Sequence, residues 1–215
     1  MTSAQQARRN ESAVPERCEL AALAAQMQVG DLVFIRIPHP PFRQVALHTG
    51  SWSNHVGIVV QAGREGVRIA ESRIPLSSVT SFENFARRSD GGRLAVSRFH
   101  RDLSVAQKMA VERAAAQRMG VLYDTGFNLE SRRQFCSRYV REVLCDATGE
   151  SVGEVKSFAD LLAERPGTSL AFWRIWYFGR IPWQRRTVTP ASVLESPLLR
   201  SVFDGCIHGF APVDS

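Results

Sequence analysis

Lysine is almost absent from this sequence. Lys108 and Lys156 are the only two, so nearly all of the 27 basic residues are arginines, and the 21 acidic residues leave a formal net charge of +6. Such a bias can mark a protein that binds nucleic acid or an acidic surface. The arginines are spread along the chain, however, and their longest clusters are pairs such as Arg87-Arg88 and Arg185-Arg186. We therefore expect a solvated basic surface and no nucleic-acid partner.

Long apolar runs are also lacking. No run reaches the ~18 residues that a membrane-spanning helix needs. The segment from Met1 to Glu16 is polar and has no apolar stretch of the kind found in secretory signals. We expect no membrane span, a cytoplasmic location, a flexible tail over residues 1–16 and a single domain over residues 17–215, a length that suits one core.

Cysteine is scarce and shows no pattern. The spacing of Cys18, Cys136, Cys145 and Cys206 fits neither a disulfide framework nor a zinc ribbon. In a cytoplasm these would be free thiols, and most would be inert, buried side chains. A functional cysteine must therefore be recognised from its local context.

The remaining sequence predicts short strands alternating with short helices. Strands are expected at 32–37, 56–61, 67–71 and 94–99, and helices at 19–27, 80–88, 104–119, 134–147 and 157–164, with another opening at Thr189-Pro190. Thr80 with Glu83, and Ser104 with Gln107, are placed as capping boxes. Residues 42–53 read as a loop or irregular strand, and 172–183 as mostly core. The predicted class is α+β, an antiparallel sheet packed against helices.

Cys136 falls in the first turn of its predicted helix. Unpaired backbone N–H groups and the positive end of the helix dipole favour a thiolate there, and the thiolate is the nucleophilic form. Cys145 lies near the other end of the same helix, where the dipole disfavours a thiolate. A buried structural cysteine is the alternative for Cys136.

His55 stands at the entry of a buried strand, which suits a rigidly held general base. The alternative is a histidine bonded to a loop carbonyl. In a hairpin turning at 63–66, paired residue numbers sum to about 128 or 129, so Glu71 becomes a diagonal neighbour of His55 on the same face. A carboxylate there would orient the imidazole, whereas an exposed strand-end charge is the alternative for Glu71.

Several short motifs, in their order and spacing, resemble the permuted members of the NlpC/P60 superfamily, in particular the YiiX/YebB-like papain-fold hydrolases. The matching pieces are Gly30 to Phe34, Asn54 to Ile58, Ala70 to Ser72, Gly120 to Asp124, Phe135 to Val140 and Val188 to Pro190. The resemblance implies a circularly permuted papain-like fold, with Cys136 as nucleophile, His55 as base, Glu71 as third member and Tyr123 lining the substrate site. Arg138 departs from the acidic residue that many relatives have after the cysteine-serine pair, which affects the expected substrate more than the chemistry.

The predicted function is that of a Cys-His-Glu hydrolase. It would cleave an amide, peptide or acyl bond through a cysteine acyl-enzyme, on a small-molecule or peptide amide substrate related to cell-wall fragments, with no cofactor and no metal. Two alternatives of the same fold stay open. One is an acyltransferase, for which Phe172 to Trp183 would be the candidate membrane-docking segment, although we expect these residues to be core. The other is a non-enzymatic module that holds an anion or other ligand with its arginines. A zinc site built from His55, Glu71 and Cys136 is a third possibility, since all three are allowed zinc ligands.

Overall fold

The structure, a computed structural model, describes residues 16–208. The tail predicted over residues 1–16 lies outside the described residues except for Glu16, which begins the first strand. The division into a tail and one domain therefore stays a prediction.

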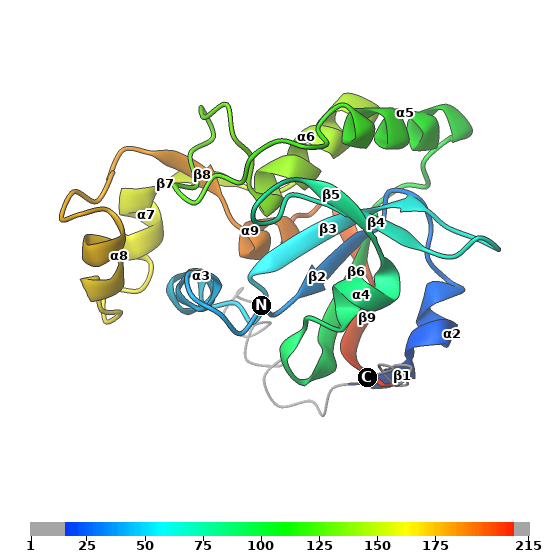
Figure 1. The fold of residues 1–215 in the computed structure, drawn as a ribbon, viewed down its shortest axis with the longest axis horizontal. Helices are drawn as coiled ribbons and strands as arrows, with labels where there is room; N and C mark the ends of the chain where they lie inside the picture. The colour runs from blue at the N-terminus through cyan, green and yellow to red at the C-terminus, as the bar shows by residue number, and fades with distance from the viewer. Residues whose placement is uncertain (1–15, 209–215) are drawn as a thin grey trace.

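A seven-stranded sheet forms the centre of the molecule (Figure 1). Its strands pair in the order β1-β9-β6-β2-β3-β4-β5, and every pair is antiparallel except β1 with β9, which run parallel. Their bounds are β1 Glu16–Glu19, β2 Leu32–Ile35, β3 His55–Gln61, β4 Arg68–Glu71, β5 Ser78–Ser81, β6 Arg93–Phe99 and β9 Leu199–His208. Strands β7 (Val155–Ser157) and β8 (Arg186–Val188) form a separate two-stranded sheet.

Helices cover both faces of the large sheet. One apolar cluster joins the sheet to α5 (Val105–Ala116) and α6 (Cys136–Thr148), and a second joins the opposite face to α2 (Leu20–Ala24) and α4 (Phe82–Ala86). The shorter helices α3 (Phe42–Thr49), α7 (Phe158–Ala163) and α8 (Ala171–Trp176) gather at one end of the molecule, with α9 (Pro190–Leu194) nearer the sheet (Figure 1). The predicted α+β class is confirmed.

Helix caps show where local signals sufficed. The capping box of Ser104 and Gln107 starts α5 as predicted. The box predicted from Thr80 and Glu83 is wrong: Thr80 belongs to β5, paired with Ile69, and Ser81 caps α4 instead. Pairing with β4 holds Thr80 in the extended conformation, so the helix starts later.

The prediction of a loop or irregular strand over residues 42–53 is wrong over most of its length, because residues 42–49 form α3. Phe42 and His48 are buried on one side of this helix, and the Thr49 hydroxyl donates to the Val45 carbonyl at 2.9 Å. Gly50, with φ of 64°, ends it. The buried side chains of α3 contact residues far along the chain, such as Tyr123 and Trp173. The local sequence alone therefore does not predict this helix.

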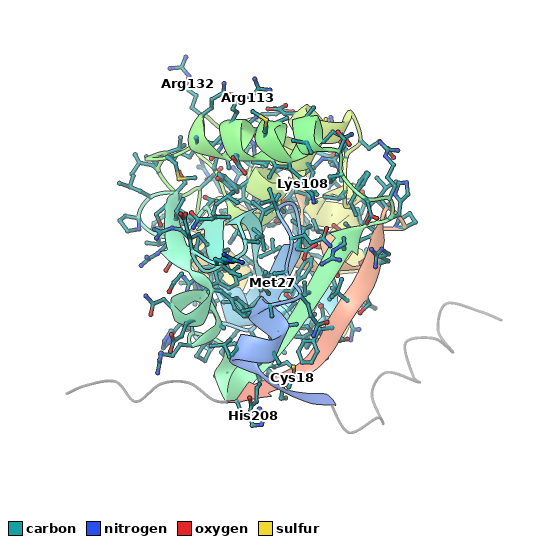
Figure 2. The ribbon with its side chains drawn as sticks, turned by 90° about the vertical axis from the view of Figure 1, so that its right-hand side faces the viewer. Cys18, Met27, Lys108, Arg113, Arg132 and His208 are labelled. Carbon is teal, nitrogen blue, oxygen red and sulfur yellow. The ribbon has the colours of Figure 1, made fainter. Side chains whose placement is uncertain are left out.

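The two ends of the described chain meet at one edge of the sheet. His208 Nδ1 lies 2.8 Å from the Cys18 carbonyl oxygen, and Figure 2 shows both residues at the foot of the molecule. At the opposite end of that view, Lys108 and Arg113 mark helix α5. Across residues 16–208, no helix has the length and apolarity needed to cross a membrane.

Candidate active site

Cys136 is the first residue of α6. Phe135 occupies the N-cap in an extended conformation and provides no side-chain cap, so the orphan N–H groups of this helix start remain available to a ligand or anion. The start of the helix is held firmly, since the Ser137 hydroxyl donates to the Val188 carbonyl at 2.8 Å and the Tyr139 hydroxyl to the Ala115 carbonyl at 3.1 Å. The Cys136 side chain is buried.

His55 is the first residue of β3, where it pairs with Ile35 of β2. Its ring is buried and held between two aromatic side chains: Phe42 meets it edge-on at 6.0 Å between centroids, and Phe85 lies tilted at 5.7 Å. This packing fixes the orientation of the imidazole before any substrate arrives.

The structure brings Glu71 to His55. The His55 Nε2 and Glu71 Oε2 atoms lie 2.6 Å apart, and both side chains are excluded from solvent. The register follows the sum of 128 expected from the sequence, since Ile58 pairs with Ala70 and Val59 with Ile69, before a bulge shifts the sum to 129 at Gln61 and Arg68. Glu71 is therefore not an exposed strand-end charge.

Sequence reasoning missed Arg88, which follows α4. Its Nη2 atom donates to both carboxylate oxygens of Glu71, at 2.7 and 2.9 Å. The guanidinium also lies 4.8 Å from the centre of the Phe85 ring, which in turn packs against His55. The sequence predicts only that Arg88 belongs to the solvated basic surface. A pair of arginines in a sequence does not show whether one of them is a surface charge or the ion-pair partner of a buried carboxylate.

The charges of these groups support one another. Burial opposes a charge on His55, but Cys136 and Glu71 together raise the pKa of its ring from 6.5 to about 9. Burial also favours the neutral form of Glu71, yet the hydrogen bond and charge of His55, followed by the charge of Arg88, hold its pKa below the ordinary value. An imidazolium next to a carboxylate is the stable arrangement here.

The thiol of Cys136 is coupled to the same pair. Burial opposes a thiolate, but the positive charge of His55 lowers the pKa of the Cys136 thiol. The Val56 backbone N–H and the Tyr123 hydroxyl, whose oxygen lies 4.0 Å from the sulfur, add to this effect. Because Nε2 of His55 is taken by Glu71, Nδ1 is the ring nitrogen left for Cys136, and it makes no hydrogen bond of ordinary geometry to any described residue.

A narrow, mostly apolar pocket with a cavity volume of about 40 Å³ opens beside Cys136. Tyr123, the predicted substrate-site residue, lines it together with Asn54. Aromatic side chains from α7, α8 and the segment before α6 form its walls: Phe127, Phe135, Phe158 and Trp173. His48 also lines this pocket, where Nδ1 lies 3.2 Å from the Trp173 indole nitrogen. A substrate with an apolar group next to its reacting carbonyl would fit here.

The other cysteines differ from Cys136 in position. Cys18, Cys145 and Cys206 are partly buried free thiols, and Cys145 lies in the last turn of α6. The residues that the structure describes contain no group of three or more His, Cys, Asp or Glu side chains placed to hold a metal ion. Of the donors named for a zinc site, the Glu71 carboxylate and His55 Nε2 are engaged with each other, and Glu71 also accepts from Arg88.

Residues 26–203 match the family described as permuted papain-like amidase enzymes, YaeF/YiiX, C92 family. The chain belongs to this permuted papain-like amidase family. It is 27% identical over 181 residues to the uncharacterized protein YiiX of Escherichia coli (strain K12), an alignment that covers 84% of this chain and 88% of that protein.

A crystal structure of yiiX from Escherichia coli O157:H7, titled as a metalloprotein, is similar in fold, with a TM-score of 0.75 and 25% identity over 84% of this chain and 99% of that one. The resemblance drawn from short motifs is therefore confirmed, and so is the permuted papain-like fold.

Proposed function

We propose that this amidase-family protein is a cysteine hydrolase that cleaves amide bonds through a Cys136 acyl-enzyme, with His55 as acid and base and Glu71 as its orienting carboxylate. The observation that carries the proposal is the buried 2.6 Å contact between His55 and Glu71 beside a cysteine at a helix start. Burying ionisable groups such as Cys136, His55 and Glu71 destabilises a fold unless their charges are paired, and such clusters with shifted pKa values are typical of catalytic sites.

The first half of the reaction forms the acyl-enzyme. The Cys136 thiolate attacks the amide carbonyl carbon, and the carbonyl electrons move to oxygen. The backbone N–H of Cys136, at the first helical position, has no carbonyl four residues earlier in the helix to bond and can donate to this oxyanion. The tetrahedral adduct collapses, the C–N bond breaks, and Nδ1 of His55 gives its proton to the departing amine.

The second half restores the enzyme. Neutral His55 accepts a proton from water through Nδ1 while the water oxygen attacks the thioester carbon. The C–S bond breaks, the carboxylic product leaves, and the thiolate and imidazolium reform. Glu71 keeps the ring in one orientation and favours its charged form throughout. If an amine or alcohol replaced the water, the same steps would make the protein an acyltransferase.

Selective alkylation tests the nucleophile without a known substrate. At pH 6, where an ordinary thiol of pKa ~8.5 is almost wholly protonated, brief iodoacetamide treatment should label Cys136 before the other cysteines, and mass spectrometry identifies the site. His55→Ala should slow this labelling. Labelling of Cys145 or Cys18 first in the folded protein would mean that the nucleophile is wrongly assigned.

A substrate screen tests the reaction itself. Peptide amides, N-acyl amino acids and esters are incubated with the wild type and with Cys136→Ala as the blank. We expect amide cleavage by the wild type alone. Equal inactivity of both, together with thermal stabilisation of both by an anionic ligand, would favour the binding-module alternative.

A further inference from the structure

Three large apolar side chains in and just after helix α8 are exposed to solvent. Ile175 is 78% exposed, Phe178 is 94% exposed and Trp183 is 44% exposed. We call these three side chains the aromatic tip. The sequence predicted residues 172–183 to be mostly core. Trp173 and Ile181 are buried, and Phe172, Trp176 and Tyr177 pack against the core, so the tip is the exception. Ile175 and Phe178 are joined by a backbone hydrogen bond at the end of α8, and exposed apolar surface commonly marks an interaction site.

The aromatic tip is held out by a fixed backbone. Phe178 has φ of 50°, in the left-handed region that a bulky residue rarely adopts, and its N–H donates to the Ile175 carbonyl at 3.1 Å. The next residue, Gly179, also has positive φ and donates to the Arg174 carbonyl at 2.6 Å. A strained conformation that leaves a phenylalanine in water has no folding advantage, which points to a use of the exposed ring.

The platform beneath the tip is anchored. The Trp176 indole donates to the Thr125 carbonyl at 3.0 Å, and the Tyr177 hydroxyl donates to the Gly126 carbonyl at 3.1 Å. The Tyr177 ring also stacks on Trp173. The tip is therefore presented on a rigid support instead of a loose loop.

The segment of the chain that carries the tip has charged residues of one sign. Between Glu164 and Glu195 the chain carries no acidic residue, and it carries five arginines: Arg165, Arg174, Arg180, Arg185 and Arg186. Arg174, Arg180 and Arg186 are exposed. A segment with exposed aromatic and aliphatic side chains and several exposed arginines has the composition of an interfacial membrane anchor, which inserts its apolar groups and attracts anionic headgroups.

The size of the tip favours a lipid surface over a folded partner. A large aromatic side chain buries at most about 250 Å², so three side chains fall short of the roughly 800 Å² that each partner contributes to a stable protein interface. Shallow insertion into a bilayer needs only a few such groups when charge assists. Helix α8 lies at one end of the molecule, away from α5 (Figure 1).

We propose that the aromatic tip docks this protein on the surface of an anionic lipid bilayer. Docking at Ile175 and Phe178 places the membrane against the short helix whose Trp173 lines the pocket beside Cys136. The protein would thus meet amides carried by, or dissolved in, the membrane. The docking itself is independent of the proposed reaction at Cys136.

Vesicle co-sedimentation of the full chain tests this. We expect binding to vesicles of equal parts phosphatidylcholine and phosphatidylglycerol at low salt, weak binding to phosphatidylcholine alone, and release as salt is raised. The triple variant Ile175→Ser/Phe178→Ser/Trp183→Ser should bind the anionic vesicles at least about tenfold more weakly. Arg174→Gln/Arg180→Gln should also bind more weakly and with less dependence on salt.

The matched control is Val105→Ser/Met109→Ser on α5, which removes two side chains that are 77% and 57% exposed. It should bind like the wild type, as should Cys136→Ala, and circular dichroism melting establishes that each variant is folded. The proposal is overturned if the wild type does not bind anionic vesicles at low salt, or if the folded triple variant binds them equally well. It is also overturned if sedimentation shows a wild-type dimer that the triple variant loses, because the tip would then be a contact between copies of the chain.

Discussion

Arg88 donates from one nitrogen to both carboxylate oxygens of Glu71, so a buried acid is tied to a cation at the protein surface. The Arg88 side chain is 30% exposed, whereas Glu71 is fully buried. Its guanidinium also covers Phe85, whose ring packs on His55. Arg88 therefore favours the ionised form of Glu71 and packs on the Phe85 ring that contacts His55. It does not contact the Cys136 sulfur.

Replacing Arg88 by glutamine should change the pH dependence of Cys136. Arg88 lowers the pKa of Glu71, so its loss lets the carboxyl group take up a proton at higher pH, and His55 then loses its charged partner. We expect the acid limb of the alkylation rate to move up by about one pH unit, with little change in the rate above that limb. The measurement is the iodoacetamide rate at Cys136 from pH 4 to 9.

Two variants separate this effect from a general loss of charge. Arg88→Lys should restore most of the wild-type pH profile. Arg87→Gln removes the neighbouring arginine, which pairs with Glu83, and should leave the profile unchanged. A profile of Arg88→Gln that matches the wild type would show that Arg88 has no positioning role.

Glutamine at position 71 should act on the opposite limb. Glu71 helps to raise the pKa of His55 to about 9, so Glu71→Gln should move the basic limb of activity to lower pH. Activity should fall by about 10- to 1000-fold, less than for Cys136→Ala, because the nucleophile and the oxyanion donor remain. Rates for the amide found in the screen, measured across pH, test this. An unchanged rate would remove Glu71 from the triad.

The Tyr123 hydroxyl should matter through the sulfur. It lies 4.0 Å from Cys136 and contributes to lowering the pKa of the thiol. Tyr123→Phe should therefore raise that pKa and slow acylation by about tenfold, while the packing of the ring against Phe42 and Phe127 is kept. Thiolate absorbance at 240 nm, titrated in both proteins, gives the pKa directly. Identical titrations would limit Tyr123 to a packing role.

Gly57 should be required for the packing around His55. A Cβ atom there would lie 2.5 Å from Ile69 Cγ2 and 2.9 Å from Phe85 Cε2. Gly57→Ala should destabilise the fold by about 1–3 kcal/mol and displace the Phe85 ring. Urea unfolding measures the first effect, and slower Cys136 alkylation reports the second. Gly167→Ala is the control, since nothing lies within 4 Å of a Cβ at that position. Equal stability of the two variants would contradict this account.

The parts of the site that follow local rules could be predicted from the sequence. The register of a hairpin is fixed by its turn, so the turn at residues 63–66 was enough to bring Glu71 near His55. The start of α6 was predicted at Gln134, two residues early, yet Cys136 fell in the first turn and occupies the first helical position. The predicted end at residue 147 is one residue early, and Gly149 forms the C-cap of the helix.

The parts that depend on distant contacts could not. Arg88 acquires its role only because α4 lies over β4, and the sequence gives no distance between the two. The helix at residues 42–49 buries Phe42 against Tyr123 and His48 against Trp173, contacts across 81 and 125 residues. The pocket beside Cys136 is built from such contacts, so its apolar character was not visible from any single segment.

The parallel pairing of β1 with β9 has a consequence for how this fold relates to papain-like enzymes of the other order. Because the two strands run side by side in the same direction, the end of β9 lies about one short strand, roughly 10 Å, from the start of β1. A few linking residues could close the backbone into a ring, and reopening that ring between β6 and α5 would place the cysteine ahead of the histidine. The sheet and every contact at the site would stay as they are. The two orders of nucleophile and base are thus separated by the position of one break in a closed loop, and not by any difference in the chemistry that the loop encloses.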